Sequence, residues 1–277
     1  MFRRCLRALV LPALFVQGAA LAANNMSPAD DPAASAVWKK VRASLFESRP
    51  IEAARDQLLT LEVPARAVDA AVVPVAVRTR LPAGSTLYVR KVYLVIDANP
   101  SPVGAIFSFT PEAGRADIET RVRVDAYSVV RAIAETSDGR LHMATGFVKA
   151  SGGCSAPAGA DAAAALASMG QMRFRVDGNI KADAPVQAQL AISHPNHSGL
   201  AMDQNSRLFT PAHFVRKVDV SYGGKPVMSA DIDFSISENP NFRFYFLPQG
   251  GAGELRATVV DTQDKRFTAA LALGDAR

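Results

Sequence analysis

The sequence predicts an all-β protein made of two immunoglobulin-like antiparallel β-sandwich domains, with a short N-terminal helix and a helical linker. Short segments rich in Val, Ile, Phe and Tyr recur along the chain between clusters of Pro, Gly and Asn. Several of these segments alternate in polarity, so that Val122 and Val124 face one way and Arg123 faces the other. One segment of different composition separates two groups of such strands.

The N-terminus has the features of a secretory signal peptide, which we expect to span residues 1–22. Three arginines precede an apolar run that ends in an Ala-Leu-Ala cleavage pattern. The run is too short to cross a bilayer, and no later segment approaches about 20 uninterrupted apolar residues. We therefore expect a periplasmic protein that does not bind membranes, in which Cys5 has left with the signal.

The charge of the chain gives no indication of nucleic-acid binding. Loss of the three signal arginines lowers the formal net charge from +5 to +2, and the remaining basic residues alternate with acidic ones. The sequence shows no basic stripe with interleaved aromatic residues.

Residues 23–150 are expected to form the first β-sandwich domain. Val37, Trp38, Val41 and Leu45 recur at helical spacing, which predicts an amphipathic helix over residues 35–46. Six strands are expected to follow, over residues 72–79, 87–96, 105–110, 118–124, 127–135 and 141–149.

Residues 151–170 are interpreted as a cysteine-bearing arm and linker, rich in Gly, Ala and Ser, with one short helix over residues 162–169. Residues 171–277 are expected to form the second β-sandwich domain, with a hairpin turn at Gly223-Gly224. Its strands are expected over residues 172–176, 186–193, 214–222, 227–234, 242–247, 254–261 and 267–273.

Cys154 is the principal candidate functional residue, as the site of covalent substrate attachment. It follows Gly152 and Gly153 and precedes Ser, Ala and Pro, so no bulky neighbour is expected to bury its sulfur. We expect an exposed thiol on an arm made flexible by Gly152 and Gly153. A single odd cysteine in an exported protein indicates a reactive thiol or an intermolecular disulfide, and an incidental exposed cysteine is the alternative.

No other pattern in the chain indicates catalysis. His194, His197 and His213 could form a metal site, but Pro195 interrupts any helical face and no carboxylate has ligand spacing, so turn or interface roles are favoured. The sequence contains no Gly-x-Ser-x-Gly turn, haem attachment pattern, phosphate-binding glycine loop or paired redox cysteines. We expect a non-enzymatic protein without metal or cofactor.

Two sets of residues resemble a known pair of proteins. The first set is similar to SoxY, the cysteine-bearing half of the sulfur-oxidation carrier: Trp38, Leu45-Phe46, Arg49-Pro50-Ile51, residues 70–75, residues 96–102 and Gly152-Gly153-Cys154. The second set is similar to SoxZ, its partner: Ser193-His194-Pro195, Ser198-Gly199-Leu200, residues 211–214 and Ser237-Glu238-Asn239-Pro240. The sets occur in this order and cover nearly the whole expected mature chain.

The fused arrangement resembles the SoxYZ-like carriers that accompany quinoprotein dehydrogenases. This resemblance implies a periplasmic carrier that holds a sulfur intermediate, such as one derived from thiosulfate, on Cys154 and presents it to sulfur-oxidising or quinoprotein dehydrogenase enzymes. In SoxY the cysteine lies on a Gly-Gly-Cys-Gly-Gly arm at the extreme C-terminus. Here Ser155, Ala156 and a second domain follow it, so the arm is tethered at both ends.

Three interpretations of the sequence remain open. The first is the covalent carrier. The second is a non-catalytic binding or assembly protein for an exported quinoprotein dehydrogenase. The third is a structural sandwich that dimerises through Cys154. In the first two we expect a monomer whose two domains pair within the chain.

Overall fold

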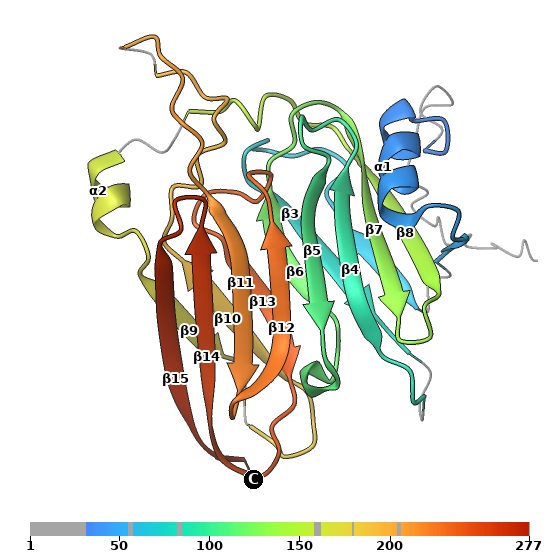
Figure 1. The fold of residues 1–277 in the computed structure, drawn as a ribbon, viewed down its shortest axis with the longest axis vertical. Helices are drawn as coiled ribbons and strands as arrows, with labels where there is room; N and C mark the ends of the chain where they lie inside the picture. Colours follow the sequence, from blue (N-terminus) through green and yellow to red (C-terminus); the bar gives the residue numbers. More distant parts are fainter. Residues whose placement is uncertain are drawn as a thin grey trace, which may run out of the picture.

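The computed structural model describes residues 32–54, 58–81, 85–157, 162–178, 180–203 and 206–276, and the expected signal peptide lies outside these residues (Figure 1). The first half contains α1 (Ala36–Phe46), β1 (Ile51–Ala53), β2 (Leu59–Glu62), β3 (Val73–Thr79), β4 (Val89–Ile96), β5 (Val103–Phe109), the 3-10 helix η1 (Pro111–Ala113), β6 (Ile118–Val122), β7 (Ser128–Thr136) and β8 (Leu141–Val148). The second half contains α2 (Ala162–Ala167), β9 (Met172–Val176), β10 (Val186–Ile192), β11 (Val215–Tyr222), β12 (Lys225–Ile232), β13 (Asn241–Phe246), β14 (Gly251–Asp261) and β15 (Arg266–Ala276). Neither helix of this described part is long and apolar enough to cross a membrane.

The strands form two immunoglobulin-like sandwiches, as the sequence predicts, and the sandwiches share their sheets. One sheet has the order β1-β8-β7-β4-β5-β12-β11-β14-β15, and the other has the order β2-β3-β6-β13-β10-β9. In the nine-stranded sheet, β5 of the first half lies next to β12 of the second half. In the six-stranded sheet, β6 of the first half lies next to β13 of the second half. The two halves therefore lie side by side as one extended double layer (Figure 1).

The seam between the halves is a regular antiparallel ladder on one side. β5 pairs with β12 over five positions, from Ala105 opposite Ile232 to Phe109 opposite Met228. On the other side the seam is shorter, and β6 pairs with β13 at Glu119 and Arg243. Because strands of both halves exchange backbone hydrogen bonds, the halves form one unit within the chain.

A single hydrophobic core runs through both halves. The ring centroids of Phe107 from β5 and Phe242 from β13 lie 6.0 Å apart at a T-shaped angle, and both rings are fully buried. The strands next to the seam alternate as the sequence predicts, with Val218 and Val220 of β11 buried in this core. Each buried aromatic or branched side chain contributes roughly 1.5–3 kcal/mol relative to exposure.

Helix α1 packs on the outer face of the nine-stranded sheet. Ser35 caps its N-terminus, where the Trp38 N–H donates to the Ser35 Oγ at 3.1 Å. Trp38 and Phe46 are buried in a second apolar cluster with residues of β4, β7 and β8. Trp38 also covers the guanidinium of Arg131, which lies 4.5 Å from the ring centroid.

Two short strands were not expected from the sequence. β1 pairs in parallel with β8, and β2 pairs with β3. They occupy a region rich in charge and proline, and they are three and four residues long, too short to show a reliable alternation. The linker helix ends at Ala167, two residues before the expected end.

Candidate functional site

Cys154 is buried, which corrects the expectation of a displayed thiol. Cys154 is the one cysteine in the part of the chain that the structure describes, and it forms no disulfide there. The exposed fraction of its surface is 0%. The segment that carries it leaves β8 at Val148 and crosses one end of the sandwich before α2 (Figure 1). Small flanking residues do not display the sulfur here, because they let the backbone lie closely against neighbouring loops.

The two glycines before Cys154 dock the arm in this structure, and their role as flexible joints of the arm stays a prediction. Gly152 has a φ of 78° and its N–H donates to the Asp125 carbonyl at 2.7 Å. The Gly153 N–H donates to the Val124 carbonyl at 3.1 Å. A Cβ at Gly153 would lie 2.1 Å from the Ala70 carbonyl oxygen, so only glycine fits this position.

The second half of the chain holds the arm from the other side. The Ser198 hydroxyl donates to the Cys154 carbonyl at 2.6 Å, and both residues are buried. The same Ser198 oxygen accepts the Leu200 N–H at 3.1 Å. Cys154 therefore lies at the seam and is held by residues of both halves.

The docked position favours the neutral thiol. Burial, together with the carboxylates of Asp125 and Asp233, raises the pKa of Cys154 to about 12, against a smaller opposing effect of the Arg123 guanidinium. At pH 7 the docked thiol is then almost entirely neutral. Because the thiolate is the nucleophile, the docked cysteine is unreactive.

Arg123 ties the halves together beside the cysteine. Its Nη1 donates to the Phe234 and Ile236 carbonyls at 2.9 and 2.8 Å, and its backbone N–H donates to the Ser235 carbonyl at 2.7 Å. Desolvation lowers its pKa, and the Cys154 and Glu238 groups oppose this shift. These bonds fix the chain next to Val124 and Asp125, where the arm docks.

Asn99, from the Asn-Pro-Ser-Pro motif, supports the same place. Its amide donates to the Arg123 carbonyl at 2.8 Å and to the Ser235 Oγ at 2.9 Å, and its oxygen accepts the Asp125 N–H at 2.9 Å. Asn239, from the Ser-Glu-Asn-Pro motif, pairs in turn with the backbone of His194. Residues from both sets of sequence motifs thus converge on the end of the sandwich that holds Cys154.

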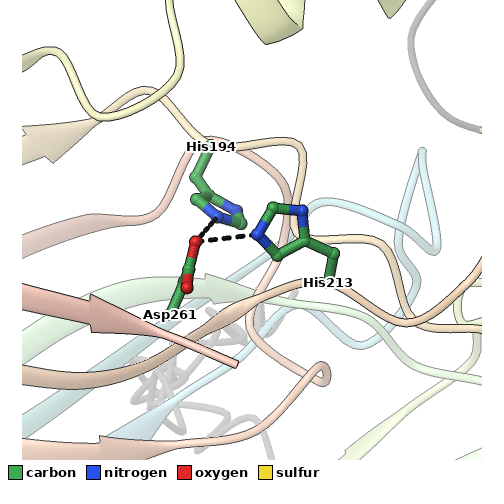
Figure 2. A group of neighbouring side chains, drawn as sticks. All are labelled: His194, His213 and Asp261. Atoms are coloured by element: carbon green, nitrogen blue, oxygen red, sulfur yellow. Dashed lines mark hydrogen bonds and ion pairs between the residues drawn. The ribbon is translucent and has the colours of Figure 1, made fainter. Parts of the chain in front are cut away.

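Two of the three histidines singled out by sequence form a buried cluster with Asp261, and Figure 2 shows the three side chains. The His213 Nε2 lies 2.7 Å from the Asp261 Oδ2, and the His194 Nε2 lies 3.5 Å from it. His197 does not join the cluster, and its backbone pairs with that of His213. Asp261 follows His213 by 48 residues, so no local spacing could reveal it.

The hydrogen bonds of this cluster suit a structural role better than metal binding. The Asn196 N–H donates to the His194 Nδ1 at 3.0 Å, so the neutral ring carries its proton on Nε2 and has no lone pair there for a metal. Burial, and then the charge of His213, lowers the pKa of His194 to about 4, which keeps the ring neutral.

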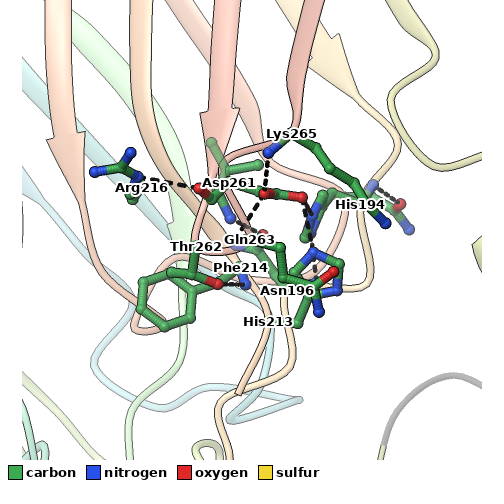
Figure 3. A network of polar contacts seen from close by, with 11 residues as sticks. His194, Asn196, His213, Phe214, Arg216, Asp261, Thr262, Gln263 and Lys265 are labelled. Carbon is green, nitrogen blue, oxygen red and sulfur yellow. Dashed lines mark hydrogen bonds and ion pairs between the residues drawn. The ribbon is translucent and has the colours of Figure 1, made fainter. Parts of the chain in front are cut away.

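Asp261 is the centre of a wider polar network (Figure 3). The N–H groups of Gln263 and Lys265 donate to its Oδ1 at 2.8 and 2.9 Å. Burial alone would raise the pKa of Asp261, but these bonds and the contact with His213 hold it below its usual range. The network anchors the turn after β14 against the loop of residues 193–199, which contains Ser198.

Comparisons with known proteins agree with this arrangement. Residues 42–154 match the family model of the sulfur oxidation protein SoxY, and residues 174–272 match that of the sulphur oxidation protein SoxZ. The SoxY match ends at Cys154. A search of curated proteins finds no match.

Solved structures give only distant likenesses. A superoxide reductase (neelaredoxin) from Ignicoccus hospitalis is 18% identical, with 42% of this chain and 89% of that chain covered and a TM-score of 0.28. Fibronectin(III)-like modules of CbhA from Clostridium thermocellum are 11% identical, covering 78% and 94%, with a TM-score of 0.25. Red sea bream transglutaminase is 12% identical, covering 85% and 33%, with a TM-score of 0.27. Values this low support no inference about function.

The fold and the docked cysteine define a class of protein in which two β-sandwiches share their sheets and hold a single thiol at their seam. Within that class, the chain carries a SoxY domain and a SoxZ domain in tandem and belongs to the sulfur-oxidation carrier proteins as a fused SoxYZ-like member.

Proposed function

We propose that this protein carries a sulfur intermediate covalently on Cys154 in the periplasm and presents it to partner enzymes. The observation that supports this most is the position of Cys154. It ends the SoxY match, follows two glycines and lies at the seam with the SoxZ domain. Cys154 is also the one cysteine left if the expected signal peptide is removed.

Loading requires the arm to leave its docked position. An undocked thiol has a pKa of about 8.5 and is a few per cent thiolate at pH 7, far more than the docked thiol, whose pKa is about 12. Released, the thiolate can attack one central sulfur of tetrathionate. A bond forms between Cys154 and that sulfur, the central sulfur–sulfur bond breaks, and thiosulfate leaves with the electron pair. The product is a thiosulfonate on Cys154.

Covalent attachment suits this task because a small sulfur anion would otherwise diffuse away between successive enzymes. The arm keeps the intermediate at high effective concentration near each partner. Redocking of the arm after unloading then returns the thiol to a buried, unreactive state.

The direct test is chemical loading followed by a genetic comparison. Reduced protein incubated with tetrathionate should gain one thiosulfonate that dithiothreitol removes, and Cys154→Ala should gain none while keeping the same far-ultraviolet circular dichroism. In the native host, Cys154→Ala should reproduce the phenotype of complete deletion. A deletion phenotype that Cys154→Ala does not share would overturn the carrier proposal.

The buried thiol favours one alternative, a non-catalytic binding or assembly protein for an exported quinoprotein dehydrogenase. In that case Cys154 is a packed side chain at the seam, and its docking is permanent. Cys154→Ser should then support full dehydrogenase activity in the host, whereas the carrier proposal requires that this variant be inactive.

A further inference from the structure

Exposed apolar side chains are concentrated at the end of the molecule that holds Cys154. Among the described residues, eight large hydrophobic side chains are exposed. Six of them lie on loops at this end, and we call them the apolar rim: Val68, Tyr127, Leu200, Met202, Leu208 and Phe209. A seventh, Leu166, is on α2, which follows the arm (Figure 1). Scattered surface hydrophobics are ordinary, but a gathering on one face marks an interaction site.

The rim follows the contacts of the arm. Each of three segments that hold the arm exposes an apolar side chain two residues from its contact. Ala70, against which Gly153 packs, is preceded by Val68. Asp125 is followed in the same way by Tyr127.

In the second half, Ser198 holds Cys154 and is followed by Leu200. From there the chain rises in a hairpin that projects beyond the end of the sandwich between β10 and β11 (Figure 1). The hairpin is held by backbone pairing of His197 with His213 and of Met202 with Phe209. Its apolar side chains are not buried against the rest of the protein, since Leu208 is 69% and Phe209 is 60% exposed.

We propose that the apolar rim is the docking surface for the enzyme that loads or unloads Cys154, a protein whose recessed active site is surrounded by an apolar collar. This inference rests on the carrier function proposed above. Because the arm that carries Cys154 is short, an enzyme that reacts with Cys154 must bind close to the arm. The 11 residues between Lys149 and Asp161 extend at most ~3.5 Å each, so a loop that goes out and returns reaches about 15–20 Å. The enzyme must therefore lie directly on this end of the protein.

The chemistry of the rim favours a protein over a membrane as the occupant. The hairpin carries one acidic residue, Asp203, and one basic residue, Arg207, so it lacks the excess of lysine and arginine with which amphipathic segments bind anionic lipids. Aromatic side chains such as Phe209 and Tyr127 are enriched in the buried cores of protein interfaces. A partner bound to the hairpin would also lie close to Ser198, whose hydroxyl donates to the Cys154 carbonyl.

The test measures two quantities for each variant: the sulfur adduct that Cys154 carries in cells, and the rate at which tetrathionate loads Cys154 in vitro. The variant Leu208→Ser/Phe209→Ser alters the hairpin, and Val68→Ser/Tyr127→Ser alters the first-half part of the rim. Val37→Ser is the comparison variant, because Val37 is exposed on helix α1 and not on a loop of the rim. Each protein is purified from the native host grown on thiosulfate, without reductant, and the sulfur adduct on Cys154 is quantified by mass spectrometry.

We expect the adduct occupancy of both rim variants to change about tenfold relative to wild type and Val37→Ser, as for the loss of two interface anchors. Occupancy falls if the loading enzyme docks on the rim and rises if the unloading enzyme does. The rate of loading by tetrathionate in vitro should stay within about twofold of wild type, which shows that the arm itself is intact.

Two results would overturn the rim proposal alone: a wild-type adduct whose occupancy both variants preserve, or a wild-type dimer in sedimentation that the rim variants convert to monomer. The second result would make the rim a contact between two copies of the chain. A wild-type protein without any adduct would overturn the carrier function, and the role of the rim with it.

Discussion

Replacing Ser198 with Ala tests the docked state of Cys154. The Ser198 hydroxyl donates to the Cys154 carbonyl at 2.6 Å in a buried setting. A buried neutral hydrogen bond contributes about 1 kcal/mol, so its loss should raise the population of the released arm about fivefold. The released thiol is the reactive form, and the rate of its modification should therefore rise about fivefold as well.

The assay is the rate at which an aromatic disulfide reagent modifies the single thiol at pH 7.5, with the reagent in excess. Ser155→Ala is the matched control, because the exposed Ser155 hydroxyl donates to the Gly152 carbonyl at 3.3 Å, within the arm itself. Its rate should equal that of wild type. A Ser198→Ala rate equal to the control rate would show that Ser198 does not hold the arm and would refute the docking argument.

Because docking raises the thiol pKa to about 12, docking stability is fully present below about pH 8.5 and is lost as the pH rises toward 12. The modification rate of wild type should then keep rising about tenfold per pH unit from pH 9 to pH 10.5, and a plateau at pH 9, as for a free cysteine, would contradict this. Gly153→Ala should release the arm, because the new Cβ would lie 2.1 Å from a backbone oxygen, and the thiol should then react as fast as it does in the urea-unfolded protein. The Cβ of Gly152→Ala meets nothing within 4 Å, so this variant should destabilise the docked arm only by the roughly 1 kcal/mol that a left-handed alanine costs. Equal reactivity of the two glycine variants would argue against the close fit. Asp261→Asn should lower the free energy of unfolding by about 1–3 kcal/mol in urea titrations, because it weakens a buried carboxylate network, and an unchanged stability would show that the network is dispensable.

The strands could be predicted because burial in a sandwich has a local signature. β10 and β13 bury every second side chain, and this period of two is visible in the sequence itself. The joining of the sheets across the seam was not predictable, because pairing of β5 with β12 depends on residues more than 100 positions apart, and nothing in either strand specifies its partner. β1 and β2 were missed because each is shorter than the window that shows alternation.

The candidate cysteine could be found from sequence, but its environment could not. The bulk of neighbouring side chains is a poor guide where burial is achieved by backbone contacts, as it is for Gly153 against Ala70 and Val124. Ser198, 44 residues away, has no pattern that connects it to Cys154. Asp261 was missed for the same reason, since only the folded turn after β14 brings it to the histidines.

The most direct test of the carrier function is the state of Cys154 in protein purified without reductant from its own host, grown on thiosulfate. Mass spectrometry of the peptide that contains Cys154 should show a sulfur adduct that dithiothreitol removes, and the intact mass should show that residues 1–22 are absent. A thiol that is unmodified in every molecule, under conditions where deletion of the gene impairs growth, would contradict the carrier function.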